Sequence, residues 1–497
     1  MVIFKIGKNE INIIFLVIIC EILYINSSEY TYLYKDTIIL KIDNLKLIES
    51  FADKNEKFIN YELIINKLVP NNLYMNISLN SQNINFPGYL TFTSQYNHLG
   101  IDTCISLENS KDYNISSQLK ELPGFQLYNS EYKKFYYLKE NISISDLDKK
   151  VYNINNIDII LPESNQRKAR CLIVGLNPDI YFDYDYDLKN LPLSIKSNTR
   201  KFNSKTYLTI LYNFNNKNND SNNTFLLIGD LPHDIFPNFF DIKNYKEIEN
   251  YSIKKELRNY YLKNPSVWAI KLDSIYIGNK SYSNETFIGQ FSLDYVPFIL
   301  PMELYRKYLS QYLDIYISKH ICEQKGRPLS NKYAHSIIGD KRQTFIFIYC
   351  KKNKIDNMTQ FYDEMPEINF INIELNKNFV FKGKELFVEE KNYTVLMLMP
   401  DMFNKMTITF GRLFMEKYLF CFNYDKNVIG FYDNNYTRNQ AIIKNNIPTG
   451  IFALLIAILL LGVFFFMIKY FKFKRIKEKN DIIERELIDV NEEKLNS

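Results

Sequence analysis

An apolar run near the C-terminus is the sequence feature that most constrains how this chain can fold. Residues 450–468 read GIFALLIAILLLGVFFFMI and contain no charged side chain. As a helix this run rises about 28 Å, close to the hydrocarbon thickness of a bilayer. Five cations follow it, namely Lys469, Lys472, Lys474, Arg475 and Lys477. Because cations beside a span favour the cytoplasmic side, the run predicts a transmembrane helix at 450–468 and a cytosolic tail at 469–497.

The N-terminus carries a second apolar segment. Lys5 and Lys8 precede an apolar core at residues 13–20, and the small residues Ser27 and Ser28 follow. This order is typical of a secretory signal peptide, here residues 1–28, and a short buried helix is the alternative. Together the two segments predict the secretory pathway and a single-pass membrane protein of the cell surface or of a vesicle or organelle membrane.

The composition excludes two classes of protein. The hydrophobic content of 46% supplies a sizeable core, so the chain is not wholly disordered. The net charge of +5 is small for 497 residues, and charges of both signs are mixed along the chain. We therefore expect no nucleic acid among its partners.

Five cysteines lie beyond the signal segment, namely Cys104, Cys171, Cys322, Cys350 and Cys421. An odd number leaves at least one thiol outside disulfides within the chain. No C-x-x-C or His/Cys cluster occurs, so we expect no metal site and no cofactor. Sequons predict a glycoprotein, and beyond the signal segment they begin at Asn76, Asn114, Asn141, Asn219, Asn222, Asn250, Asn279, Asn284, Asn357, Asn392 and Asn435.

The region between the two apolar segments has a β pattern. Short runs rich in Ile, Tyr, Phe and Val, such as 206–214, 224–231 and 344–350, alternate with clusters of Asn, Asp, Ser and Pro. A polar segment at 213–224 separates two β-rich halves. One helix is expected after Pro301, where apolar residues recur at Leu304, Tyr308, Tyr312 and Ile315.

The second half resembles the pepsin-like (A1) aspartic proteases. Three segments, 267–279, 288–309 and 406–433, follow the order of that family's C-terminal lobe. Trp268 stands at the family's tryptophan strand, and Asp294 at the catalytic Asp. The helix-preceding proline is Pro301, and Gly411, Phe414, Tyr418 and Phe422 match the last segment. The resemblance implies a mostly β, bilobal pepsin-like fold with an N-terminal lobe at 70–212, a C-terminal lobe at 224–438 and a C-terminal transmembrane helix.

The active-site motif departs from the family pattern. Aspartic proteolysis needs two carboxylates that share a proton and a water. Asp294 is retained, but Tyr295 and Val296 replace the Thr and Gly that follow it in the family. In the first half Thr93 aligns with the family's first catalytic Asp, and an alternative alignment with a longer insertion places Asp102 there.

The resemblance also implies a flap residue and a disulfide. Tyr137 is the candidate for the tyrosine of the flap that covers the substrate, although the flap's glycines are missing. Cys322 ends the predicted helix and Cys350 ends the next predicted strand. In the family a cystine ties this part of the second lobe, which implies a Cys322–Cys350 bridge.

These observations favour a membrane-anchored pepsin-like protein that has lost catalysis and binds a peptide or protein in its inter-lobe cleft. One alternative is an atypical but active aspartic endopeptidase with Asp102 and Asp294 as its dyad. The other alternative is a structural surface ectodomain. The first two differ in whether a second carboxylate lies across from Asp294.

Overall fold

The described part of the chain falls into two units. In this computed structural model the structure describes residues 37–44, 73–79, 84–92, 97–100, 113–114, 120–121, 134–145, 151–162, 168–169, 171–178, 189–198, 205–212, 224–237, 239–251, 267–282, 286–328, 344–390, 392–401, 405–433, 466–480 and 482. Those up to residue 433 belong to one compact unit, and those from 466 onward belong to a second.

The first unit is built around one sheet of 13 strands. Its strands run, from one edge to the other, in the order β13 (Tyr245–Glu249), β28 (Val428–Tyr432), β27 (Phe420–Asn423), β11 (Tyr207–Leu211), β12 (Thr224–Gly229), β1 (Ile38–Asn44), β2 (Leu73–Leu79), β3 (Ile84–Thr91), β10 (Cys171–Gly175), β4 (Asn97–Gly100), β8 (Val151–Pro162), β7 (Phe135–Ser145) and β6 (Lys120–Glu121).

Four smaller sheets complete the β structure. A five-stranded sheet has the order β14 (Ala269–Leu272), β17 (Phe287–Phe291), β26 (Thr407–Phe410), β18 (Phe298–Pro301), β25 (Leu398–Asp401). Two four-stranded sheets have the orders β16 (Lys280–Tyr282), β15 (Ser274–Ile277), β21 (Ile368–Asn372), β22 (Lys377–Phe381), and β19 (Cys322–Pro328), β20 (Thr344–Lys351), β24 (Tyr393–Leu396), β23 (Phe387–Glu389). The last sheet pairs β5 (Tyr113–Asn114) with β9 (Lys168–Ala169). The fold is therefore mostly β.

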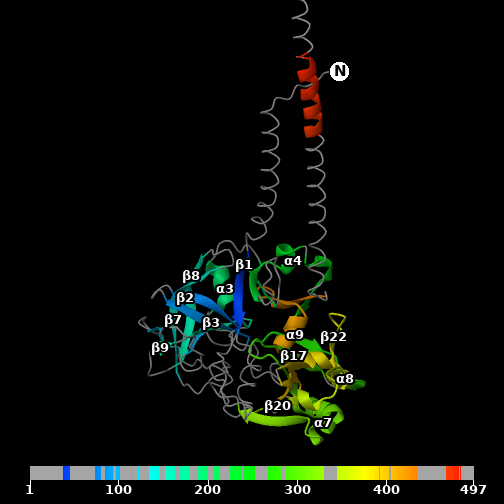
Figure 1. The fold of residues 1–497 in the computed structure, drawn as a ribbon. Helices are drawn as coiled ribbons and strands as arrows, with labels where there is room; N and C mark the ends of the chain where they lie inside the picture. The colour runs from blue at the N-terminus through cyan, green and yellow to red at the C-terminus, as the bar shows by residue number, and fades with distance from the viewer. Residues whose placement is uncertain are drawn as a thin grey trace, which may run out of the picture. The chain divides into compact units, whose positions relative to one another are not determined.

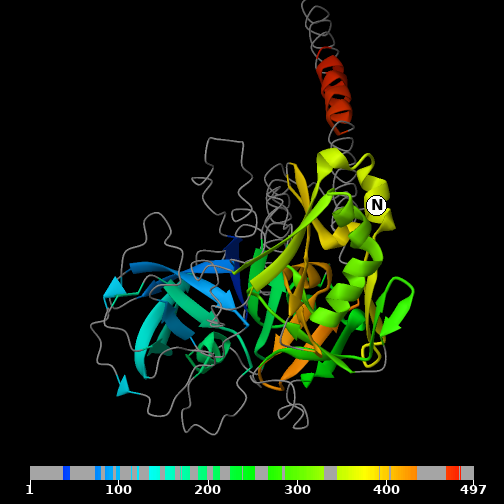
Figure 2. The ribbon, with the colours of Figure 1, turned by 90° about the horizontal axis from the view of Figure 1, so that it is seen from below.

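Helices are short in the first unit. They are α3 (Leu191–Asn198), α4 (Pro232–Ile235), α6 (Met302–Tyr308), α7 (Asp314–Ser318), α8 (Met358–Glu364), α9 (Arg412–Lys417), the π-helical η4 (Leu309–Leu313) and the 3-10 turns η2 (Ile242–Asn244), η5 (Lys352–Lys354) and η6 (Gly383–Leu386). The helix expected after Pro301 forms from α6, η4 and α7, which are green in Figure 2. Leu304 and Tyr308 are buried, whereas Ile315 is 56% exposed.

Strand β1 joins the two halves of the chain. Its first residues pair antiparallel with β12, Ile38 opposite Ile228, and its last residues pair antiparallel with β2, Asp43 opposite Tyr74. In Figure 1 this blue strand stands between the strands of the two halves. An N-terminal segment therefore hydrogen-bonds to both halves at once.

The hydrophobic core is also shared between the halves. Phe92 meets Phe422 edge to face, with ring centroids 4.8 Å apart. The indole Nε1 of the fully buried Trp268 donates to the carbonyl oxygen of Leu176 at 3.0 Å. The predicted bilobal pepsin-like architecture is therefore corrected to a mostly β unit in which one sheet and one core run through both halves.

No helix among the described residues is long and apolar enough to cross a membrane. Of the predicted span at 450–468, only residues 466–468 lie within the described part of the chain.

Asn250 is a sequon asparagine with a structural role. Its side chain is fully buried, and its amide nitrogen donates to Val267 O at 3.2 Å and to Asn427 Oδ1 at 3.0 Å. Its amide oxygen accepts from Ala269 N at 3.0 Å. Asn76 also heads a sequon, but it is exposed on β2. The two asparagines share a sequence motif and differ in environment.

We predict that Asn250→Ala lowers the free energy of unfolding by about 2–3 kcal/mol, because it leaves buried polar groups without partners. The matched change Asn76→Ala, at an exposed position, should stay within about 0.5 kcal/mol of the parent. Denaturant unfolding of both variants measures this. Equal effects would contradict the buried network around Asn250.

Candidate functional site

Asp294 lies in the loop between β17 and β18. It is half-buried, and its Oδ2 accepts from Ser292 Oγ at 3.3 Å while its backbone N–H donates to the same hydroxyl at 3.2 Å. These bonds hold the carboxylate against its own loop. This arrangement is a local serine–aspartate turn.

The same loop is fixed by the start of α9. A side chain at Gly411 would place its Cβ 2.3 Å from Pro297 O and 2.6 Å from Val296 O. The backbone N–H of Arg412 donates to Tyr295 O at 2.9 Å. Only glycine allows the two backbones to approach this closely, so Gly411 sets the position of the loop that carries Asp294.

Of the other residues predicted for the active site, the structure describes Tyr137 alone. Thr93 and Asp102 lie outside the described residues. Tyr137 lies on β7, half-buried and paired with Ile160 of β8, with Lys120 Nζ 5.5 Å from its ring centroid. Within the described ranges no group of three or more His, Cys, Asp or Glu residues could hold a metal ion.

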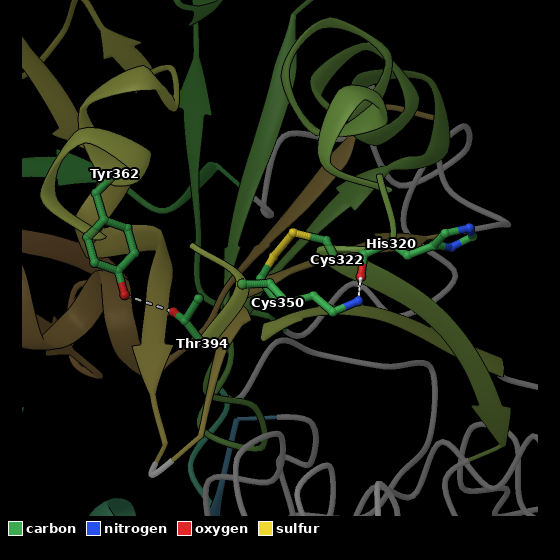
Figure 3. Close-up of a disulfide and its surroundings, with 6 residues drawn as sticks. His320, Cys322, Cys350, Tyr362 and Thr394 are labelled. Carbon is green, nitrogen blue, oxygen red and sulfur yellow. Dashed lines mark hydrogen bonds between the residues drawn. A yellow bond between two sulfur atoms is a disulfide. The ribbon is translucent and has the colours of Figure 1, made fainter. Parts of the chain in front are cut away.

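The cysteine pair predicted from the sequence lies on one hairpin. Cys322 begins β19 and Cys350 lies near the end of β20, and the structure joins their sulfur atoms in a disulfide (Figure 3). Both cysteines are buried. Cys421 is a buried free cysteine, and burial raises the pKa of its thiol to about 12, so the thiolate nucleophile is scarce at neutral pH.

Strand β19 is the end strand of its sheet in the described structure. Cys322 and Cys350 are directly opposite, with their Cα atoms 3.9 Å apart, and Lys351 N donates to Ile321 O at 3.0 Å. This geometry marks 322–350 as a non-hydrogen-bonded pair. Because the pattern alternates, the backbone N–H and C=O groups of Gln324 and Gly326 point away from β20, toward the outer edge of the sheet.

A charged triad lies on one face of this hairpin. The carboxylate of Glu323 accepts hydrogen bonds from Lys351 Nζ and from the hydroxyl of Tyr349, which is the residue opposite it on β20. These bonds, that of Lys351 foremost, lower the pKa of Glu323 below its usual 4.5. The carboxylate is therefore kept ionised, and its charge is compensated by a neighbouring lysine.

The hairpin and the Asp294 loop share a hydrophobic cluster. Buried Tyr295 packs in one cluster with Phe347 and Tyr349 of β20 and with Val395, Met397 and Met399. The loop that Gly411 positions therefore packs directly against the hairpin.

No functional role was expected for Glu323, Tyr349 or Lys351 from the sequence. A signal was nevertheless present, because a bridge between cysteines 322 and 350 on paired strands places residue 323 beside residue 349. Glu323 and Lys351 flank the two cysteines in the sequence. The bridge fixes how the two strands pair, and this pairing brings the opposite charges of Glu323 and Lys351 together.

The comparisons with known proteins identify no family. No family model matches the chain, and no curated protein matches it. Similar solved structures include basic 7S globulin from soybean, with 11% identity and a TM-score of 0.47 over 80% of this chain and 97% of the globulin. Conglutin gamma, a basic 7S globulin from lupine seeds, has 9% identity and a TM-score of 0.48 over 81% and 96%. Similarity at this level transfers no function.

The assignment to the pepsin-like proteases is corrected by these findings. No family model and no curated protein assigns the chain to that family. Two functions were derived from that resemblance. One was binding of a peptide or protein in the inter-lobe cleft of a protein that has lost catalysis, and the other was an active endopeptidase. Both are withdrawn with it. The structural ectodomain is likewise not carried further.

We predict a pH-dependent contribution from Glu323. Because its pKa is lowered on folding, its ion pair stabilises the fold above pH 4.5 and is lost as pH falls through the lower folded-state pKa. Glu323→Gln should therefore cost stability at neutral pH, and the difference from the parent should shrink on acidification. Unfolding curves from neutral to acidic pH measure this.

The variant Lys351→Met tests the cause of that shift. It removes the largest contributor to the lowered pKa of Glu323. Its free energy of unfolding should therefore fall furthest below that of the parent at neutral pH. Parallel stability curves for the parent and Glu323→Gln across the whole pH range would contradict the triad.

Proposed function

We propose that the protein is an extracytoplasmic binding protein that takes up an extended segment of a protein partner as an added strand on β19. The observation that carries this proposal is the position of β19 at the end of its sheet, with the backbone groups of Gln324 and Gly326 directed outward. Strand addition uses such main-chain groups for affinity and alternate side chains for specificity.

The charges on the hairpin favour an acidic segment. Lys325 is exposed on β19, and Lys319 is exposed just before it. Glu323, the acidic residue of the strand, is paired with Lys351. By sequence, residues 322–328 carry two basic side chains, Lys325 and Arg327, against the one acidic side chain of Glu323. A second copy of the chain would bring like charges together across the new strand pair, which disfavours self-pairing and favours a different, acidic partner.

The edge is held rigidly before any partner arrives. The disulfide fixes one end of the hairpin, and α7 packs against β19. Closing a loop with a sequence separation of 28 residues stabilises the folded state by about 3–4 kcal/mol in the loop-entropy account. A strand that is already ordered loses little conformational entropy on binding, and this supports affinity.

The disulfide and the N-terminal segment support an extracytoplasmic location. Disulfides persist in oxidising compartments, and residues 1–28 have the pattern of a secretory signal. Sequon asparagines at Asn76, Asn141 and Asn279 are exposed. The proposal therefore places the hairpin in the secretory route, where a bridge of this kind forms.

A displayed library of short peptides, selected on the full chain, tests the proposal. We expect selected peptides to alternate β-branched residues with acidic ones. Gln324→Pro removes one outward N–H without touching the ladder to β20, and should weaken binding about tenfold, through the lost hydrogen bond and the clash of the ring with the incoming strand. Gln324→Thr keeps the N–H and should bind within about twofold of the parent, because exposed side-chain changes are small.

Folding of both variants is checked separately. Mass mapping of the Cys322–Cys350 bridge and the unfolding temperature should match between the proline and threonine variants. Selected peptides that bind the proline variant as tightly as the parent would overturn strand addition at β19.

A further inference from the structure

The helix at residues 466–480 carries an aromatic stripe. Phe466, Tyr470 and Phe473 recur at the spacing that puts them on one face of a helix, and they are 70%, 56% and 72% exposed. This helix belongs to the second unit and is red in Figure 1. Every residue from 466 to 480 is exposed. An aromatic face of this kind suits the boundary between headgroups and acyl chains.

Cations border the aromatic stripe on both sides. At about 100° per residue, Lys469 and Lys474 flank the stripe, and Lys477 continues it by one turn. The far face holds Lys472, Arg475 and Lys479. Glu478 is the only acidic residue between 466 and 480, and it is 3.9 Å from Lys474 Nζ. The helix thus carries six cations against one anion.

We propose that this helix docks on a membrane surface that contains anionic lipids. Its aromatic stripe would lie in the headgroup region, and the flanking lysines would extend to the phosphates beside it. Clusters of four to eight Lys and Arg residues attract anionic lipid surfaces, and each charge near the surface adds to the affinity. This interaction is independent of strand addition at β19, which involves the first unit.

The experiment uses the full chain and two kinds of vesicle. One kind is phosphatidylcholine alone, and the other mixes phosphatidylcholine with phosphatidylserine. The apolar residues before 466 are present in both measurements, so the ratio of the two partition coefficients reports the anionic contribution. We expect a ratio of at least about one hundred at low salt, falling steeply as salt is added.

Two charge-matched variants locate the docking face. The flank variant changes Lys469, Lys474 and Lys477 to Gln, and the far-face variant changes Lys472, Arg475 and Lys479 to Gln. The flank variant should lower the ratio about a hundredfold, because its charges lie at the surface. Measured at about 0.1 M salt, where the Debye length is about 10 Å, the far-face variant should lower it about tenfold or less, because its charges lie near one Debye length away. Equal losses would contradict this orientation.

A second pair of variants tests the aromatic stripe. Phe473→Ser should weaken binding to both kinds of vesicle about tenfold, whereas Phe471→Ser, on another face, should have a clearly smaller effect. Equal binding of the parent to both kinds of vesicle would overturn the proposal. Retention of single-stranded RNA by the parent, without preference for phosphatidylserine, would show instead that the helix is a nucleic-acid-binding element.

Discussion

The pairing of β1 with both β12 and β2 is the interaction on which the rest of the first unit depends. One strand near the N-terminus hydrogen-bonds to strands that begin more than 30 residues and more than 180 residues later in the chain. Thr37 strengthens this junction, because its hydroxyl donates to Asp230 Oδ2 at 3.1 Å and accepts from Asp230 N at 3.0 Å. Without this strand the large sheet would divide at its centre.

Close packing connects the body of the first unit to the β19–β20 hairpin. Gly411 lets the start of α9 press against the loop that follows Asp294, and Tyr295 of that loop packs with Phe347 and Tyr349. The hairpin is then fixed on its other face by the bridge between Cys322 and Cys350. The outer edge of β19 is therefore presented by a supported element, and rigid presentation is what strand addition requires.

Local sequence patterns predicted the secondary structure that depends on neighbouring residues. The β character follows from short runs of Ile, Tyr and Phe, and the helix after Pro301 follows from its apolar spacing. The junction at β1 could not be predicted, because pairing between distant strands leaves no periodic trace in either segment. The same limit applies to the outer edge of β19, which depends on where β24 pairs with β20. Asp294, which residue identity placed in a protease motif, lies in a turn closed by Ser292, and this turn could not be read from the motif.

Hydrogen exchange at single amides of β19, in the free chain, tests most directly whether this edge is open. The account predicts fast exchange at Gln324 and Gly326 and slow exchange at Glu323 and Lys325, because only the latter two amides are bonded to β20. Slow exchange at all four amides would show that another segment already covers the edge, and would contradict the proposed function.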